Sequence, residues 1–214
     1  MRYIAINWLY LILSTVVLWT PLVLFVGRRL RKKLTYPERN YCVGMNHLLL
    51  SPWSWLDLLR SGAAAWVLVH LAVKVTVIKQ TVALRVIDQT NPYPALGLQV
   101  AILGIGVLLQ VFATGNVLIR VAPLFYLMGV AIGVAPWQMA VFGGLLALTI
   151  GGLVRWPLGV FLFLPVCYAG FAYLFKQLSP LYLVPAALSG TAFVCSMLID
   201  RPLAWLVTHT QARE

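Results

Sequence analysis

Acidic residues, and charges of any kind, are scarce in this chain of 214 residues. It has five Asp and Glu against sixteen Lys and Arg, and charged residues make up 10% of it, whereas a soluble domain has about 25%. Hydrophobic residues make up 62% of the chain and its mean hydropathy is +0.91. So few carboxylates disfavour metal or proton chemistry that depends on them. The composition predicts an integral membrane protein.

Cysteine is scarce as well, and its spacing excludes the usual metal and disulfide patterns. Cys42, Cys167 and Cys195 form no C-x-x-C pair, so we expect neither a metal site nor a disulfide framework, and no cofactor. The net charge of +11 would suggest nucleic acid as the partner of a soluble protein. Here the basic residues lie beside apolar runs, where they suit anionic lipid head groups. We therefore expect membrane lipids, and no nucleic acid, as partners.

A long uncharged run occupies residues 5–27 and is long enough to cross a hydrocarbon core of about 30 Å as a helix. The five cations that follow it are Arg28, Arg29, Arg31, Lys32 and Lys33. Short positive loops stay cytoplasmic, so this cluster predicts an N-terminus outside the cell membrane and a cytoplasmic C-terminus. The alternative, a cleaved secretory signal, is disfavoured because no small-x-small cleavage site precedes the charges.

Six further spans are predicted from the breaks between the other apolar runs. They lie near residues 62–78, 95–114, 117–135, 137–154, 157–175 and 180–199. Pro157 and Pro180 stand where a helix begins. The predicted fold is all-α, a polytopic helical membrane bundle in one domain, 1–214. It has about seven transmembrane helices, or five if 117–154 is re-entrant. In this topology eleven of the sixteen Lys and Arg residues lie inside and four outside.

Residues 28–60 form a basic cytoplasmic loop in this topology, and we expect an interfacial helix near its end. Ser51 is a candidate N-cap, Pro52 suits the first helical position, and Asp57 and Arg60 are spaced i, i+3. Trp53 and Trp55 suit the head-group boundary. With the basic cluster they are the predicted contacts with anionic lipid or a partner. Two alternatives stay open: the helix merely extends the next span, and the cations only orient the first span.

A possible polar site inside the membrane is formed by His70 and Lys74 in the second predicted span. At a spacing of i, i+4 they share one helix face with Trp66. An ionisable residue inside a span often marks function. The alternative is that Lys74 snorkels to the outer boundary while His70 is a hydrogen-bonded packing residue.

Catalytic motifs are lacking. His47 does not begin the H-x-x-x-x-D pattern of glycerolipid acyltransferases, because Pro52 occupies the acidic position, and no D-x-x-x-D cluster is present. Close-packing stripes such as Gly129-x-x-x-Gly133 are typical of membrane bundles of any function. We therefore expect a noncatalytic subunit or scaffold of a membrane complex, with other membrane subunits as partners.

Two other functions stay open. A small-solute or lipid transporter would use helices broken by proline and glycine, with a polar path along Gln99, Gln110, Gln138 and Thr149. A membrane-embedded lipid-modifying enzyme would use the polar patch of Asn46, His47, Ser51 and Asp57.

Overall fold

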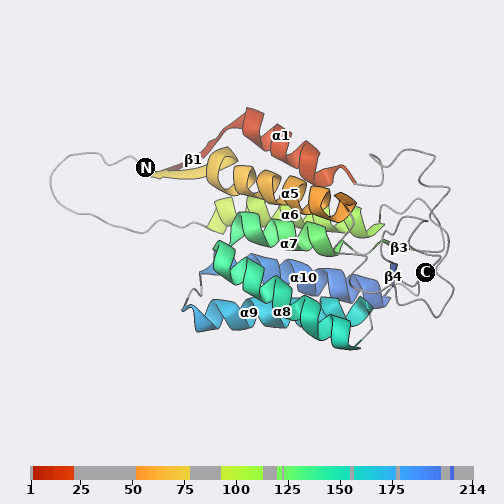
Figure 1. The fold of residues 1–214 in the computed structure, drawn as a ribbon. Coiled ribbons are helices and arrows are strands. Elements are labelled where there is room, and N and C mark those ends of the chain that lie inside the picture. Colours follow the sequence, from red (N-terminus) through yellow and green to blue (C-terminus); the bar gives the residue numbers. More distant parts are fainter. Residues whose placement is uncertain are drawn as a thin grey trace, which may run out of the picture.

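The protein is described by a computed structural model that places residues 2–21, 52–77, 93–112, 120–121, 123–154, 157–176, 179–198 and 203–204. These residues form seven α-helices that lie side by side along one common direction (Figure 1). A short pair of β-strands lies at each end of the bundle. The predicted all-α class is confirmed.

The first helix is shorter than the apolar run that predicted it. Strand β1 covers Arg2–Ile6 and helix α1 covers Trp8–Trp19. Asn7 begins the helix because its side-chain oxygen accepts a hydrogen bond from the Tyr10 amide (3.4 Å). Thr20 is extended, as expected for a residue that precedes a proline. The prediction that one helix begins at residue 5 is wrong, and residues 22–27 lie outside the described ranges.

The predicted interfacial helix is not a separate element. Helix α5 runs without a break from Pro52 to Val67 and continues as a π-helical segment, η1, over Leu68–Ala72. One side of this continuous helix is buried, at Ser54, Asp57, Ser61, Ala65 and Leu68. Because this buried side continues past residue 60, the helix stays packed there and has no reason to end. The predicted break between 51–60 and 62–78 is therefore wrong, and the structure agrees with the alternative in that one helix continues through this point, while its crossing of a membrane stays a prediction.

Strand β2 follows the π-helical segment directly and covers Val73–Val77. It pairs antiparallel with β1, so that Ile6 lies opposite Val73 and Ala5 opposite Lys74. The β-branched residues of this segment favour the extended form. Since the helix ends before Lys74, the prediction that His70 and Lys74 share a helix face is wrong.

The remaining helices agree better with the predicted spans. They are α6 (Tyr93–Phe112), α7 (Leu124–Val134), α8 (Trp137–Val154), α9 (Pro157–Leu174) and α10 (Pro180–Leu198). The predicted helix starts at Pro157 and Pro180 are confirmed. Helix α7 begins later than residue 117, because Pro123 occupies its N-cap and strand β3 (Arg120–Val121) precedes it. β3 pairs parallel with β4 (Leu203–Ala204).

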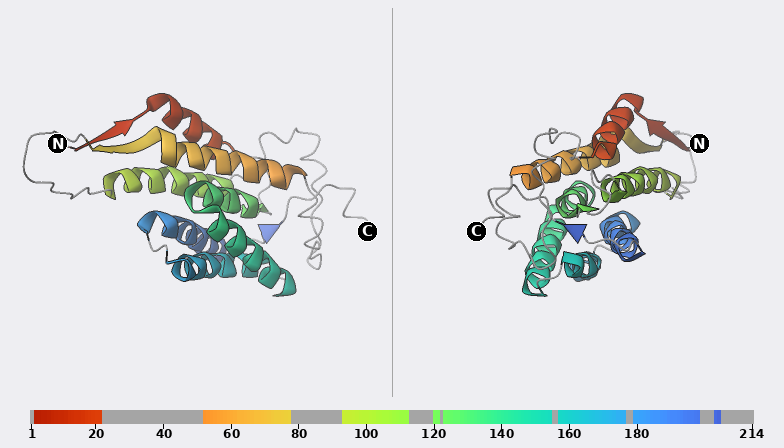
Figure 2. Two further views of the ribbon diagram at one scale, coloured as in Figure 1. Left: turned by 60° about the vertical axis from the view of Figure 1, so that its left-hand side comes forward. Right: turned by 90° about the vertical axis from the view of Figure 1, so that its right-hand side faces the viewer.

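Helix α7 lies at the centre of the bundle, with α1 and α5 on one side and α8 and α9 on the other (Figures 1 and 2). Ten of its eleven residues are buried. It packs against α5 at close range: a Cβ on Gly62 would lie 3.2 Å from the Gly129 carbonyl oxygen, and one on Gly133 would lie 2.5 Å from the Gly62 carbonyl oxygen. The predicted packing role of Gly129-x-x-x-Gly133 is thus confirmed.

Among the described helices, one segment, Pro94–Phe112, is both long and apolar enough to cross a membrane by length and composition. Five other apolar helical segments are shorter, with 10 to 17 residues each. The multi-span part of the fold prediction therefore stays a prediction.

Candidate functional site

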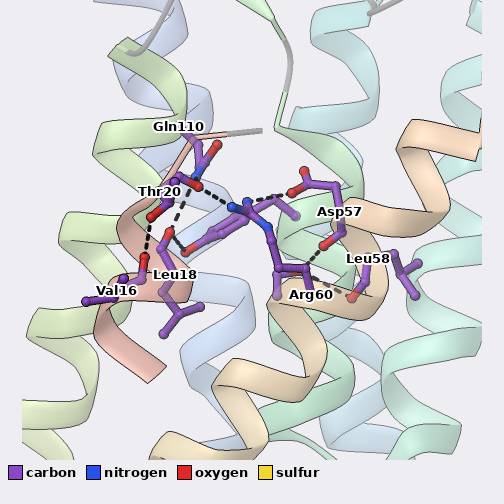
Figure 3. A network of polar contacts seen from close by, with 9 residues as sticks. Val16, Leu18, Thr20, Asp57, Leu58, Arg60 and Gln110 are labelled. Atoms are coloured by element: carbon purple, nitrogen blue, oxygen red, sulfur yellow. Dashed lines mark hydrogen bonds and ion pairs between the residues drawn. The ribbon is translucent and has the colours of Figure 1, made fainter. Parts of the chain in front are cut away.

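The polar node is a group of five residues that meet at the end of α1: four side chains from α5, α6 and α7 and the main-chain carbonyl of the residue after α1 (Figure 3). Its members are Thr20 after α1, Asp57 and Arg60 on α5, Gln110 on α6 and Tyr126 on α7. At its centre Arg60 Nη2 lies 2.6 Å from Asp57 Oδ1, and the two side chains are only 11% and 12% exposed. Asp57 is the one acidic side chain within the described ranges, so this ion pair is the main charged feature of the described interior.

Arg60 also joins α5 to α1 and α7. Its Nη1 group donates a hydrogen bond to the carbonyl oxygen of Thr20. The guanidinium carbon lies 5.9 Å from the centre of the Tyr126 ring, which is within the range of a cation–π interaction. One cation therefore contacts a carboxylate, a main-chain carbonyl and an aromatic ring at once.

The node binds the carbonyl groups that the end of α1 leaves without helical partners. Gln110 Nε2 donates to the carbonyl oxygens of Leu18 (3.3 Å) and Thr20 (3.2 Å). The Tyr126 hydroxyl donates to the Leu18 carbonyl at 3.3 Å. Gly106 on α6 leaves room for the Tyr126 hydroxyl, because a Cβ at position 106 would overlap that oxygen.

A second glutamine of α6, Gln99, also donates to main-chain carbonyl groups, here those of the segment that follows α5. Gln99 Nε2 lies 3.4 Å from the carbonyl oxygens of Val69 and Val73, where the π-helical segment changes into strand β2. Gln99 and Gln110 are eleven residues apart, or about three helical turns, so they lie on the same side of α6. Buried glutamines thus bind the irregular backbone at both places.

Two fully buried tyrosines give a matched test of the node. The Tyr168 hydroxyl on α9 has no hydrogen-bond partner among the described residues, whereas that of Tyr126 binds Leu18. We expect Tyr126→Phe to lower the free energy of unfolding by about 1 kcal/mol, and Tyr168→Phe to leave it unchanged or raise it slightly. Denaturant titration in mild detergent measures both. Equal losses in the two variants would contradict the hydrogen bond at Tyr126.

The structure does not bring the predicted site residues together. His70 is exposed on η1, with its ring centre 5.3 Å from that of Trp66, and Lys74 lies on β2. The half-exposed Trp55 ring lies 6.2 Å from the Phe125 ring. Trp53 is on α5, but its side chain lies outside the description. The basic cluster at residues 28–33, with Asn46, His47 and Ser51, falls outside the described ranges.

The sequence pointed to part of the node without locating it. The spacing of Asp57 and Arg60 predicts an i, i+3 pair but places it at the membrane surface, and the sequence indicates Gln110 only as a polar residue within a span. Tyr126 was missed, since a tyrosine in an apolar helix carries no signal of its own. The usable signal was the presence of an acid and an arginine one turn apart in a chain with so few acids.

The node has the chemistry of a structural or cation-binding site. In the part of the chain that the structure describes, no three His, Cys, Asp or Glu side chains gather as a metal site. The fold and the node define an all-helical bundle with a buried ion pair within α5 whose arginine also contacts α7 and the end of α1. No protein-family model matches this chain, and comparisons with curated proteins and with solved structures also find no match.

Proposed function

We propose that this chain is a multi-pass protein of the cell membrane. The support is the apolar composition and the position of large apolar side chains on the outside of the bundle. On α1, Trp8, Leu9, Ile12, Leu13 and Val16 are each more than half exposed. On the opposite side of the bundle, three further apolar side chains are also more than half exposed: Leu145 and Leu153 of α8 and Val166 of α9. Apolar surfaces of this extent are typical of lipid or partner contacts.

We place the N-terminus outside and the C-terminus in the cytoplasm, on the charge bias of the sequence. In a variant without the three native cysteines, a thiol reagent that does not cross membranes is expected to label a cysteine at position 90 from outside. Cysteines at positions 33 and 155 should react only after the membrane is permeabilised. Labelling of position 33 in intact cells would contradict this orientation.

Within the membrane we propose a noncatalytic subunit or scaffold of a membrane complex. The observation that carries this proposal is that the polar groups of the node, and Gln99 elsewhere on α6, bind one another or the backbone. Asp57 is paired with Arg60, and Gln99 and Gln110 bind main-chain carbonyls. Buried polar groups satisfied in this way make a unique and rigid packing. A rigid interior with apolar outer sides suits a subunit that holds other membrane proteins.

A transporter is the second candidate, and one observation favours it. Helix α1 ends at Trp19, and the carbonyl of the next residue, Thr20, binds the Arg60 cation, as carbonyls do at ion sites of discontinuous helices. A lipid-modifying enzyme is the third candidate. Asp57 is the one residue of the proposed polar patch that the structure describes, and its carboxylate is bound to Arg60.

The partners in this proposal are other membrane subunits and anionic lipid head groups at residues 28–33. Tagged protein extracted in mild detergent is expected to copurify with a membrane protein in fixed stoichiometry. Changing Arg31, Lys32 and Lys33 to Gln, with Arg28 and Arg29 kept for topology, should weaken binding to that protein or to anionic vesicles while membrane insertion stays normal.

The same preparation separates the two main candidates. Reconstituted vesicles of the purified chain should show no solute flux above empty vesicles if it is a scaffold. A chain that purifies alone and carries a solute across the vesicle membrane would overturn the scaffold and favour the transporter. Unchanged binding in the Gln variant would leave the basic cluster as a topology signal only.

A further inference from the structure

Three kinds of cation acceptor converge on the end of the Arg60 side chain (Figure 3). The Asp57 carboxylate lies 2.6 Å from Nη2, the Thr20 carbonyl binds Nη1, and the Tyr126 ring lies under the guanidinium carbon. Thr20 and Arg60 are forty residues apart in the sequence. Tyr126 comes from a third helix, α7. A carboxylate, a carbonyl and a ring face together form a cation site, because each presents negative charge or partial negative charge.

The position of α1 strengthens this site. The helix ends at Trp19, and its last carbonyls carry the negative end of the helix dipole. Twelve residues separate Trp8 from Thr20, and twelve separate Arg60 from Ala72, so each helix places the node about 18 Å from the end where β1 and β2 pair. The Asp57 and Arg60 side chains are mostly shielded from solvent there, so their charges interact more strongly than in water.

We propose that the polar node is a binding site for a guanidinium group and that Arg60 fills it as the chain's own ligand. The acceptors bind the two terminal nitrogens and the flat face, whereas Arg60 Nε is buried and has no hydrogen-bond partner among the described residues. The described acceptors thus bind the outer edge and one face of the guanidinium plane. A planar fork of donors suits these acceptors better than a lysine ammonium would. Helix α1 is then docked to the bundle through a bound cation.

Removing the resident ligand should open the site to a free one. Purified Arg60→Ala protein in mild detergent is expected to melt several degrees below the wild type, and millimolar guanidinium chloride should raise its melting temperature along a saturating curve. Sodium chloride and methylammonium chloride at the same ionic strength should give no such rise. The double variant Asp57→Asn/Arg60→Ala should need several-fold more guanidinium, because one acceptor has lost its charge.

The wild type is the matched control, since its own Arg60 occupies the site. An equal rise in the wild type would mean that guanidinium binds elsewhere and would overturn the proposal. So would an Arg60→Ala protein that responds equally to guanidinium and methylammonium, or to neither.

If the Arg60→Ala protein does not accumulate, the Asp57→Asn variant tests the proposed guanidinium site instead. Its Arg60 keeps the Thr20 carbonyl and the Tyr126 ring, so the site predicts that Asp57→Asn accumulates as a folded protein that melts below the wild type. Loss of folded Asp57→Asn protein to the same extent would reduce the node to a simple ion pair and overturn the proposal.

Discussion

Gly133→Ala is expected to lower the free energy of unfolding by about 2 kcal/mol or more, although alanine is the better helix former. The added methyl would lie 2.5 Å from the Gly62 carbonyl oxygen and 2.8 Å from both the Ala65 Cβ and the Trp66 amide nitrogen. Backbone atoms on α5 cannot turn aside as a flexible side chain can. Helices α5 and α7 must therefore move apart, and the contact at the centre of the bundle is lost.

The control for this variant is the same substitution where the structure has room. A Cβ on Gly170 of α9 would meet nothing within 4 Å, so Gly170→Ala should be neutral or stabilising by up to about 1 kcal/mol. Denaturant titration of both proteins in the same detergent gives the comparison. Similar changes in the two variants would show that α5 and α7 do not approach as closely as described.

The second large effect is expected at Arg60. Arg60→Met keeps most of the side-chain volume but leaves the buried Asp57 carboxylate without its partner, and we expect a loss of about 3–5 kcal/mol. The matched control is Lys176→Met. Lys176 is exposed at the end of α9, and a surface change of this kind should stay within about 0.5 kcal/mol.

A double variant separates the ion pair from simple packing. Asp57→Leu/Arg60→Met leaves no unpaired charge in the interior, so it should recover the greater part of the stability lost in Arg60→Met. The recovery is measured as the difference between the two unfolding free energies. A double variant that is less stable than Arg60→Met would mean that Asp57 is accommodated without Arg60.

The helical part of the fold was readable from the sequence because local features determine it. Long apolar runs without charge predict helices, and Pro52, Pro157 and Pro180 stand at helix starts in the structure, since proline lacks the amide hydrogen that a first-turn residue does not use. Helix α8 has the predicted bounds, 137–154. The spacing of Gly129 and Gly133 indicated close packing, though not the partner helix.

The candidate site was readable only in part. An acid and an arginine one turn apart form the same i, i+3 pair on a surface and in a core, so the sequence showed the pair but not its burial. The two tryptophans beside Asp57 favoured the membrane boundary. In the structure α1 and α7 cover Asp57 and Arg60, and both helices come from distant parts of the chain.

The sequence by itself determined the all-helical class, most helix positions and the scarcity of charge that makes one ion pair stand out. Only the tertiary structure decided that α1 is short, that α5 runs through the predicted break, that residues 73–77 form a strand, and that the node exists. The reason is physical. Helix propensity and proline act within a few residues, whereas burial, strand pairing and the binding of carbonyls at the end of α1 depend on which distant segments come into contact.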